Sequence, residues 1–255
     1  MSIASNLEQL RNQIADAAAR AHRDPSTVAL MAVSKMHPAE AILEAHAAGQ
    51  RLFGENRVQE WQAKRLSLQH LFDATRSPSP AAQALIGPLQ NNKTAKAAEI
   101  FTAIDTLDSL KTAARLNAAA QSLGKILPIL IEVKLSPEDT KQGLDPQDPL
   151  ALPNLLAALQ PRQHLQVRGL MTVPPFSDDP ETARPYFQHL RRLRDENLAL
   201  HPTLTELSMG MSNDFRVAIE EGSTTVRIGT AIFGKRRVPH PGSPASVVGS
   251  LGWNP

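Results

Sequence analysis

The fold is indicated most clearly by 207-LSMGMSNDFRVAIEEGSTTVRIGTAIFG-234. Two short apolar runs in this stretch end in small or hydroxyl-bearing residues, at 208–212 and 227–230, and the amphipathic segment 214–221 lies between them. This order of strand, glycine turn, helix, strand and glycine turn is typical of parallel α/β barrels and sheets. Backbone N–H groups freed by glycines, together with Ser and Thr hydroxyls, bind phosphate at such turns. The stretch therefore predicts a site for a phosphorylated ligand.

Apolar runs that suit buried strands recur eight times along the chain. They cover residues 28–33, 51–54, 84–87, 101–104, 126–133, 167–173, 204–209 and 225–228. Helix-like segments lie between them at 39–48, 58–65, 93–99, 109–123, 181–196 and 214–221, and prolines interrupt a further candidate at 145–160. Strand followed by helix, repeated, indicates parallel pairing with right-handed crossovers. Eight such units favour an α/β fold closed into a single (β/α)8 barrel of the TIM type.

The two ends of the chain depart from this repeat. Leu7, Leu10, Ile14 and Ala18 recur at helical spacing, so we expect an extra N-terminal helix that ends before Pro25. We expect no helix after the eighth strand, because residues 238–255 are rich in Pro, Gly and Ser. The prediction is one barrel domain at 1–234, with a loop and no boundary at 77–80, followed by an irregular tail at 235–255.

Composition excludes several classes of function. The 255 residues suit one barrel, and the formal net charge of +2 is too small to argue for nucleic-acid binding. The chain has no cysteine, which excludes disulfides and thiolate chemistry, and its histidines show no metal-ligand spacing. The N-terminal segment has no signal-peptide core, and no apolar run is long enough to span a membrane. A cytoplasmic monomer with no membrane or nucleic-acid partner is the simplest expectation.

Lys35 is a candidate for covalent chemistry. It lies at the carboxyl end of the first predicted strand, and alternation places it on the same face as Val33. Desolvation in an enclosed barrel mouth disfavours the ammonium form of a lysine. The neutral amine is the form that makes a Schiff base with a carbonyl compound. An ordinary solvated lysine at a strand end remains the alternative.

Arg227 and Asn56 are candidates for ligand contacts. Arg227 lies two residues before Gly229, on the same face of the eighth predicted strand. A guanidinium stays charged, so when buried it needs a carboxylate, a phosphate or a ring nitrogen as its partner. A structural salt bridge is as good an explanation as a ligand. Asn56 ends the second predicted strand, where it serves either a ligand or a turn.

With these residues in place, the chain resembles the pyridoxal phosphate homeostasis proteins, also called proline synthase co-transcribed proteins. Their fold is the alanine racemase N-terminal barrel. The matching segments run in order across almost the whole chain: AVSK at 32–35, LFGENRVQE at 52–60, IGPLQNNK at 86–93, VRGLMTVP at 167–174, LSMGMSNDF at 207–215 and VRIGTAIFG at 226–234.

The resemblance implies a role for each candidate residue. Lys35 matches the lysine that forms a Schiff base with pyridoxal 5′-phosphate (PLP), Arg227 the arginine that faces the pyridine nitrogen, and Asn56 a residue near the ring. The other implied cofactor contacts surround the phosphate: Ser208, Met209, Gly210, Ser212, Gly229 and Thr230. The resemblance names no metal and no catalytic residue.

An arginine at the pyridine nitrogen bears on function. It leaves that nitrogen unprotonated, so the ring is a weaker electron sink than in PLP enzymes that place a carboxylate there. The resemblance therefore implies a PLP-binding protein of vitamin B6 and amino-acid homeostasis without robust catalysis, and it leaves PLP-dependent apo-enzymes open as recipients.

Two enzyme classes are the alternatives. The first is a PLP-dependent amino-acid racemase, which needs a second base. The only tyrosine, Tyr186, falls inside the predicted helix 181–196. The second is a sugar-phosphate aldolase or isomerase in which Lys35 binds the substrate.

The sequence departs from the family pattern at a few positions. Gln83, Ala84 and Leu85 stand where many relatives have Trp-His-Phe, and Asp105 stands where a His is common. The loop at 135–140 also differs. We expect all of these positions at strand ends near the barrel mouth, where they would affect regulatory or substrate contacts and leave cofactor binding intact.

Overall fold

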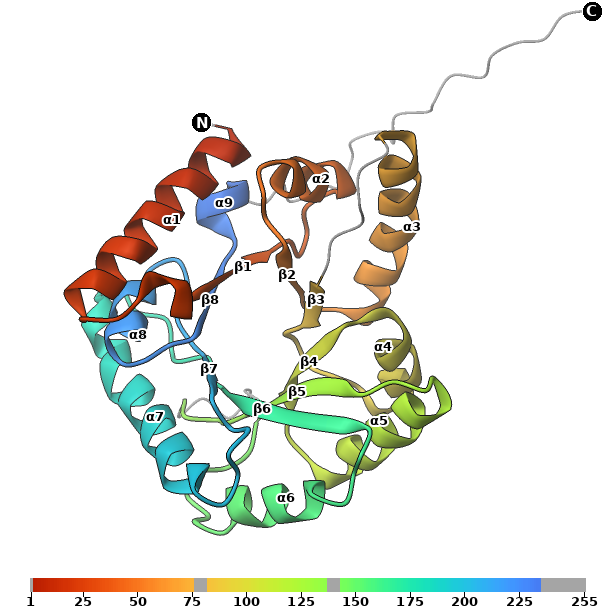
Figure 1. Cartoon of the computed structure of the whole chain (residues 1–255), viewed down its shortest axis with the longest axis vertical. Coiled ribbons are helices and arrows are strands. Elements are labelled where there is room, and N and C mark those ends of the chain that lie inside the picture. Colours follow the sequence, from red (N-terminus) through yellow and green to blue (C-terminus); the bar gives the residue numbers. More distant parts are fainter. Residues whose placement is uncertain (1, 76–81, 137–142, 235–255) are drawn as a thin grey trace, which may run out of the picture.

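Eight parallel strands close into a barrel in chain order, with β8 beside β1, in the computed structural model of the chain (Figure 1). The structure describes residues 2–75, 82–136 and 143–234. The strands are β1 (Ala29–Val33), β2 (Leu52–Glu55), β3 (Ala82–Leu85), β4 (Ala103–Leu107), β5 (Leu127–Glu132), β6 (Leu165–Met171), β7 (Glu206–Ser208) and β8 (Thr225–Ile228). The predicted barrel is confirmed. The expected loop at 77–80 and the tail at 235–255 lie outside the described residues.

Helices form a ring around the barrel (Figure 1). They are α2 (Ala39–Ala47), α3 (Val58–Thr75), α4 (Thr94–Ile100), α5 (Leu110–Ser122), α6 (Ala151–Leu159), α7 (Arg184–Leu198) and α8 (Phe215–Glu220), with short 3-10 turns at Pro25–Thr27, Asn91–Lys93 and Pro180–Ala183. The interrupted candidate at 145–160 is helical only as α6. Pro149 precedes that helix and Pro153 lies in its first turn, where a missing N–H costs no helical hydrogen bond. None of the helices described is long and apolar enough to cross a membrane.

The extra N-terminal helix is present as α1 (Ile3–Arg20), and the four predicted apolar residues are buried. It packs against α2, α8 and a short helix, α9 (Thr230–Phe233). The expectation that no helix follows β8 is therefore wrong. The helix α9 has only four residues and ends at Gly234, whose φ is +81°. It is therefore too short to show a periodic pattern in the sequence. The Asn6 side chain donates to the Ile232 carbonyl over 2.9 Å and joins α1 to α9.

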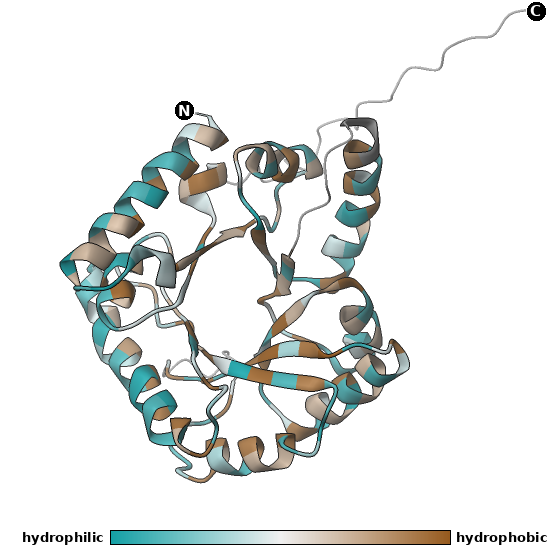
Figure 2. Ribbon diagram, in the orientation of Figure 1, coloured by the Kyte–Doolittle hydropathy of each residue, from teal (hydrophilic) through white to brown (hydrophobic). Residues whose placement is uncertain are grey.

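The apolar core lies between the strands and the helices, and Figure 2 shows the brown residues concentrated there. Fully buried strand residues such as Phe53, Ile104 and Leu170 belong to this core. A cavity of about 440 Å³ at the amino end of the barrel is lined by Ala84, Asp105 and residues that precede several strands.

The four single-residue departures do not lie at the barrel mouth, and for them the expectation is wrong. The differing loop at 135–140 does reach the mouth, since Ser136 lines a cavity at the carboxyl ends of the strands, while residues 137–140 lie outside the described residues. The third strand covers Ala82–Leu85, two residues earlier than predicted, so Gln83, Ala84 and Leu85 fall within it. Gln83 and Leu85 are buried, and Leu85 packs into the core between strands and helices. Ala84 and Asp105 line the amino-end cavity.

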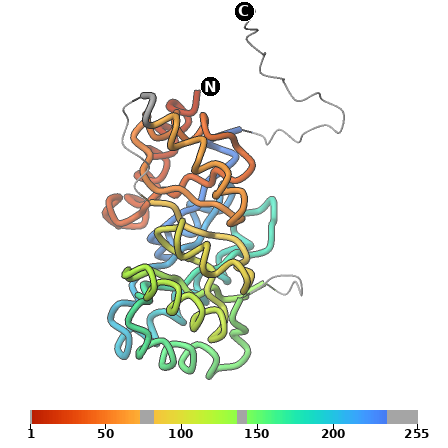
Figure 3. Tube along the Cα trace, turned by 90° about the vertical axis from the view of Figure 1, so that its right-hand side faces the viewer, coloured from red at the N-terminus to blue at the C-terminus, as the bar shows by residue number. Residues whose placement is uncertain are grey.

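In the side view of Figure 3 the segment after β6 (cyan) projects from one side of the barrel, while the connection from α1 to β1 (red) lies on the other.

Candidate functional site

A cavity of about 630 Å³ opens at the carboxyl ends of the strands, where parallel barrels place their functional groups. Its walls come from the ends of seven strands and from the loops that follow them. Six of the predicted site residues line it: Lys35, Asn56, Ser212, Arg227, Gly229 and Thr230. Residues separated by almost 200 positions in the sequence thus meet at one site. Their roles toward a cofactor stay predictions.

A buried polar network holds the loop that carries Lys35. β1 ends at Val33, and Ser34 and Lys35 follow it. The Ser34 hydroxyl donates to Glu55 Oε1 over 2.7 Å. Lys64 Nζ, from α3, donates to the Ser34 carbonyl and to Glu55 Oε1, each over 2.7 Å. The residue before Lys35 is therefore anchored to both β2 and α3.

The same network reaches the residue after Lys35. The Met36 backbone N–H donates to Glu60 Oε1 over 2.5 Å, and Lys64 forms an ion pair with Glu60 over 2.8 Å. Met36 has a φ of +62°, a conformation that an unbranched side chain adopts only when its surroundings hold it. Lys64 thus fixes the backbone on both sides of Lys35. Sequence reasoning missed it, although Glu60 and Lys64 stand four residues apart on a predicted helix.

Replacing Lys64 by methionine should lower the free energy of unfolding by about 2–3 kcal/mol. Glu55 is fully buried, and burial already raises its pKa against the opposing effect of Lys64. Removing one partner of a buried pair leaves the other uncompensated. Urea unfolding at pH 7 measures the change. As a control, Lys96→Met removes the exposed pair with Glu99 and should cost less than about 0.5 kcal/mol. Equal costs for the two variants would contradict the buried network.

Arg227 is buried in the cavity wall with a fractional exposure of 5%. Its Nη1 donates to Ser208 Oγ and its Nη2 to the Thr172 carbonyl, each over 2.7 Å. Burial lowers its pKa, and the carboxyl groups of Asp105 and Glu132 oppose this effect. Within the described residues no carboxylate forms an ion pair with it, so the salt bridge considered from the sequence is not found there. Two of its five N–H donors are used, which leaves donors for a ligand.

The remaining predicted residues of this stretch support the wall without lining the cavity. Ser208 is fully buried and accepts the hydrogen bond from Arg227. Met209 is fully buried in the core between strands and helices, because alternation along β7 turns its side chain outward. The Gly210 carbonyl accepts from the Arg227 backbone N–H over 2.9 Å. If Ser208, Met209 and Gly210 lie near a phosphate as predicted, they would contact it through backbone atoms of this turn.

Two turns form the side of the cavity where the sequence predicts a phosphate. In the turn after β7, the Met211 N–H donates to Asp214 Oδ1 over 2.5 Å, which leaves Ser212 at the cavity wall. After β8, Gly229 leads into α9. A Cβ at Gly229 would lie 3.1 Å from the Val33 carbonyl oxygen, so only a residue without a side chain fits easily between β8 and β1. The first turn of α9 has N–H groups without partners inside the helix.

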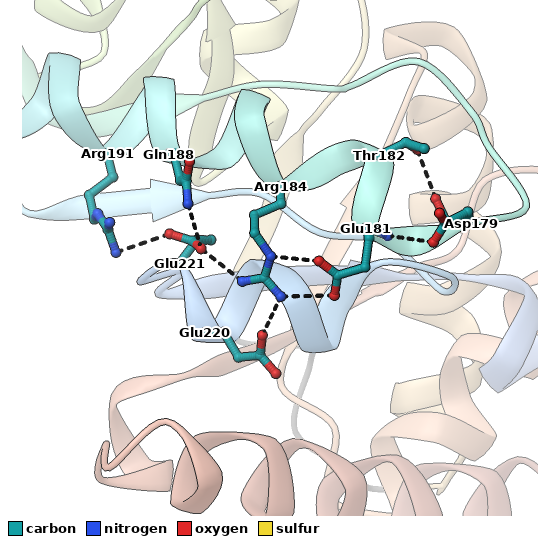
Figure 4. A network of polar contacts seen from close by, with 8 residues as sticks. All are labelled: Asp179, Glu181, Thr182, Arg184, Gln188, Arg191, Glu220 and Glu221. Carbon is teal, nitrogen blue, oxygen red and sulfur yellow. Dashed lines mark hydrogen bonds and ion pairs between the residues drawn. The ribbon is translucent and has the colours of Figure 1, made fainter.

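A charged network holds α8, the helix that follows the first of these turns (Figure 4). Arg184 of α7 forms ion pairs with Glu181 (2.6 Å), Glu220 (2.6 Å) and Glu221 (2.8 Å). Arg191 adds a contact to Glu221 over 3.2 Å. These contacts tie α7 to the C-terminal end of α8, the end opposite to the turn at 211–214.

Asn56 and Gly87 meet where β2 and β3 end. A Cβ at Gly87 would lie 2.3 Å from the Asn56 carbonyl oxygen and 2.8 Å from its Cα, both backbone atoms. Glycine at 87 is therefore required for the close approach that brings Asn56 to the cavity. Both residues line it.

Comparisons with known proteins show the family of the chain. The family model described as alanine racemase, N-terminal domain, matches residues 5–237. The pyridoxal phosphate homeostasis protein of Pseudomonas aeruginosa is 43% identical over 96% of this chain and 99% of the relative. The protein of the same name from Escherichia coli K12 is 41% identical over 92% of this chain and 97% of its own. The chain belongs to the pyridoxal phosphate homeostasis protein family.

Solved structures give the same result for the fold. PipY of Synechococcus elongatus with PLP bound has a TM-score of 0.78 and 42% identity, over 91% of this chain and all of that one. Its structure without PLP has a TM-score of 0.80. An alanine racemase of Clostridium difficile shares the fold, with a TM-score of 0.63 at 14% identity.

The structure places three further residues of this member of the pyridoxal phosphate homeostasis protein family relative to the cavity. Tyr186 lies on α7 in the outer ring of helices and does not line the cavity. Glu132 and Lys134, at the end of β5, do line it, and sequence reasoning missed both. The sequence pattern could have indicated them, because alternation along the apolar run 126–133 places residues 130, 132 and 134 on one face of the strand.

Proposed function

We propose that the chain binds PLP in the carboxyl-end cavity, holds it as a Schiff base on Lys35, and serves vitamin B6 and amino-acid homeostasis. The carrying observation is that Lys35, Arg227 and the two turns at 211–214 and 229–230 share one cavity. The names of the curated relatives and the PLP-bound structure of PipY support the same cofactor.

The residues present fit the chemical groups of PLP. The spare N–H donors of Arg227 suit the lone pair of a pyridine nitrogen. The hydroxyls of Ser212 and Thr230, with the N–H groups at the start of α9, suit a phosphate dianion. Asn56 offers an amide beside the ring. When bound, PLP supplies an aldehyde that a primary amine captures and a ring that withdraws electrons.

The protein's own groups favour holding this cofactor over using it. Arg227 is a donor that stays charged, so it keeps the ring nitrogen unprotonated and limits carbanion stabilisation. The network of Lys64, Glu55 and Glu60 fixes the backbone around Lys35. Nothing favours the racemase alternative, since the only tyrosine lies on α7 outside the cavity.

A PLP titration of the purified chain tests the proposal. We expect one equivalent of PLP to bind and to give a visible absorption band distinct from that of free PLP. Alanine of either chirality, added afterwards, should show no loss of optical purity at enzymatic rates. Failure to bind PLP would refute the proposal, and rapid racemisation would favour the enzyme alternative.

A further inference from the structure

The Glu132 and Lys134 side chains form a part of the cavity wall that the proposed PLP contacts leave unused. Both residues line the same cavity as Lys35. Within the described residues, neither the Glu132 carboxyl nor the Lys134 ammonium makes a hydrogen bond or an ion pair, with each other or with a third group. Opposite charges on one wall, each without a partner among the described residues, present a matched pair to a ligand.

The backbone that presents them is fixed. The Val133 N–H donates to the Met171 carbonyl over 2.8 Å, which extends the pairing of β5 with β6. The Lys134 N–H donates to the Leu144 carbonyl over 3.0 Å, and the Leu144 N–H donates to the Glu132 carbonyl over 2.7 Å. Residues 132 and 134 therefore stand on the same face of an extended segment, about 6–7 Å apart along it. That spacing lets the two side chains converge on one small molecule.

The charge around Glu132 favours a cation there. Burial raises the pKa of this carboxyl to about 7, and Asp108 adds to the rise while Arg227 opposes it. The positive charge of Arg227 also interacts with the carboxyls of Asp105 and Asp214. One positive charge therefore does not balance the negative charges of these two carboxyls and of Glu132. A ligand that brings an ammonium group to Glu132 would relieve this excess of negative charge.

We propose that Glu132 and Lys134 form a subsite for a free α-amino acid, with the α-ammonium group on Glu132 and the α-carboxylate on Lys134. It deepens the proposed function, on which it rests for placing PLP in the other part of the cavity. The subsite brings the commonest class of cellular primary amine next to the place where Lys35 holds the cofactor.

Binding of L-alanine to the full-length chain at pH 8 tests the subsite by calorimetry. The measurement is made without added PLP, and again after PLP loading and borohydride reduction. We expect L-alanine to bind at least about ten times more tightly than acetate or methylammonium, because only the zwitterion satisfies both charges. Glu132→Gln and Lys134→Met should each weaken alanine binding about tenfold or more. Glu206→Gln, a carboxyl of the amino-end cavity paired with Arg168, should leave it unchanged.

The pH dependence supplies a second readout. Alanine binding should strengthen from pH 6 to pH 8 as the Glu132 carboxyl ionises, and Glu132→Gln should flatten this rise. The other ionisable groups in the cavity, among them Lys35, His37, Asp214 and Arg227, are unchanged in that variant.

The outcomes separate cleanly. Absence of alanine binding, or equal binding by the two variants and the wild type, would overturn the subsite. Acetate binding as tight as alanine binding would also overturn it and would indicate a simple anion site on Lys134. The PLP titration is read independently, so a chain that binds PLP but not alanine refutes only the subsite.

Discussion

Replacing Lys35 by alanine should abolish the visible absorption band that appears when PLP is added to the wild-type chain. Lys35 lies at the end of β1 in the cavity wall, where the proposed Schiff base forms. The contacts of Arg227 and of the two turns remain, so PLP should still bind, but about 100-fold more weakly, which corresponds to about 2.7 kcal/mol. Absorption and fluorescence titrations with PLP measure both effects.

The control for this substitution is Lys111→Ala, an exposed lysine on α5. It should bind PLP with the wild-type spectrum and affinity. A Lys35→Ala protein that keeps the visible band would assign the linkage to another lysine. A variant that loses the band but is also unfolded by circular dichroism would be replaced by Lys35→Arg, which keeps the charge and cannot form the same linkage.

Replacing Asp105 by asparagine should stabilise the protein at pH 8 by about 2–4 kcal/mol. Asp105 lines the amino-end cavity with a fractional exposure of 5%. Burial raises the pKa of this carboxyl from 3.8 to about 7, and Glu206 adds to the rise while Arg227 and Arg168 oppose it. An ionised carboxyl in this position is therefore costly, at about 1.4 kcal/mol for each unit of the shift. Loss of its interaction with Arg227 offsets part of the gain.

The sign of this effect sets its pH dependence. Because the pKa of Asp105 is higher in the folded protein than in the unfolded chain, the contribution of Asp105 to wild-type stability falls as pH rises from about 4 to about 7. Asp105→Asn removes this fall, and its advantage should be smaller at pH 5 than at pH 8. Urea unfolding at the two pH values measures it, with Asp16→Asn, an exposed site on α1, as the control. Destabilisation by Asp105→Asn at pH 8 would show that the ionised carboxyl is needed beside Arg227.

Much of the fold could be predicted because period and order are local properties of the sequence. Alternating strands and helices predict parallel pairing, and alternation within a strand predicted that Val33 and Lys35 share a face. The helix α9 was missed because four residues carry no period. The positions of Gln83 and Asp105 within the barrel were predicted wrongly, because an apolar run does not fix where a strand begins. An error of two residues is enough to move a residue from the middle of a strand to its end.

The candidate site was predictable only in part. Lys35, Arg227 and the glycine turns have recognisable chemistry and lie in segments that resemble a known family. The role of Lys64 depends on three partners, Ser34 after β1, Glu55 of β2 and Glu60 of α3, and no pattern within one segment indicates such a network. Met209 was predicted from its place in the turn, yet its side chain points into the core, because a contiguous motif says nothing about which of its residues face outward.

The most direct test of the central claim is borohydride reduction of the PLP-treated chain, followed by peptide mapping by mass spectrometry. The account predicts one PLP group per chain, attached to Lys35. Attachment to a different lysine of the cavity, such as Lys134, or the absence of any reducible linkage in a chain that binds PLP, would contradict it.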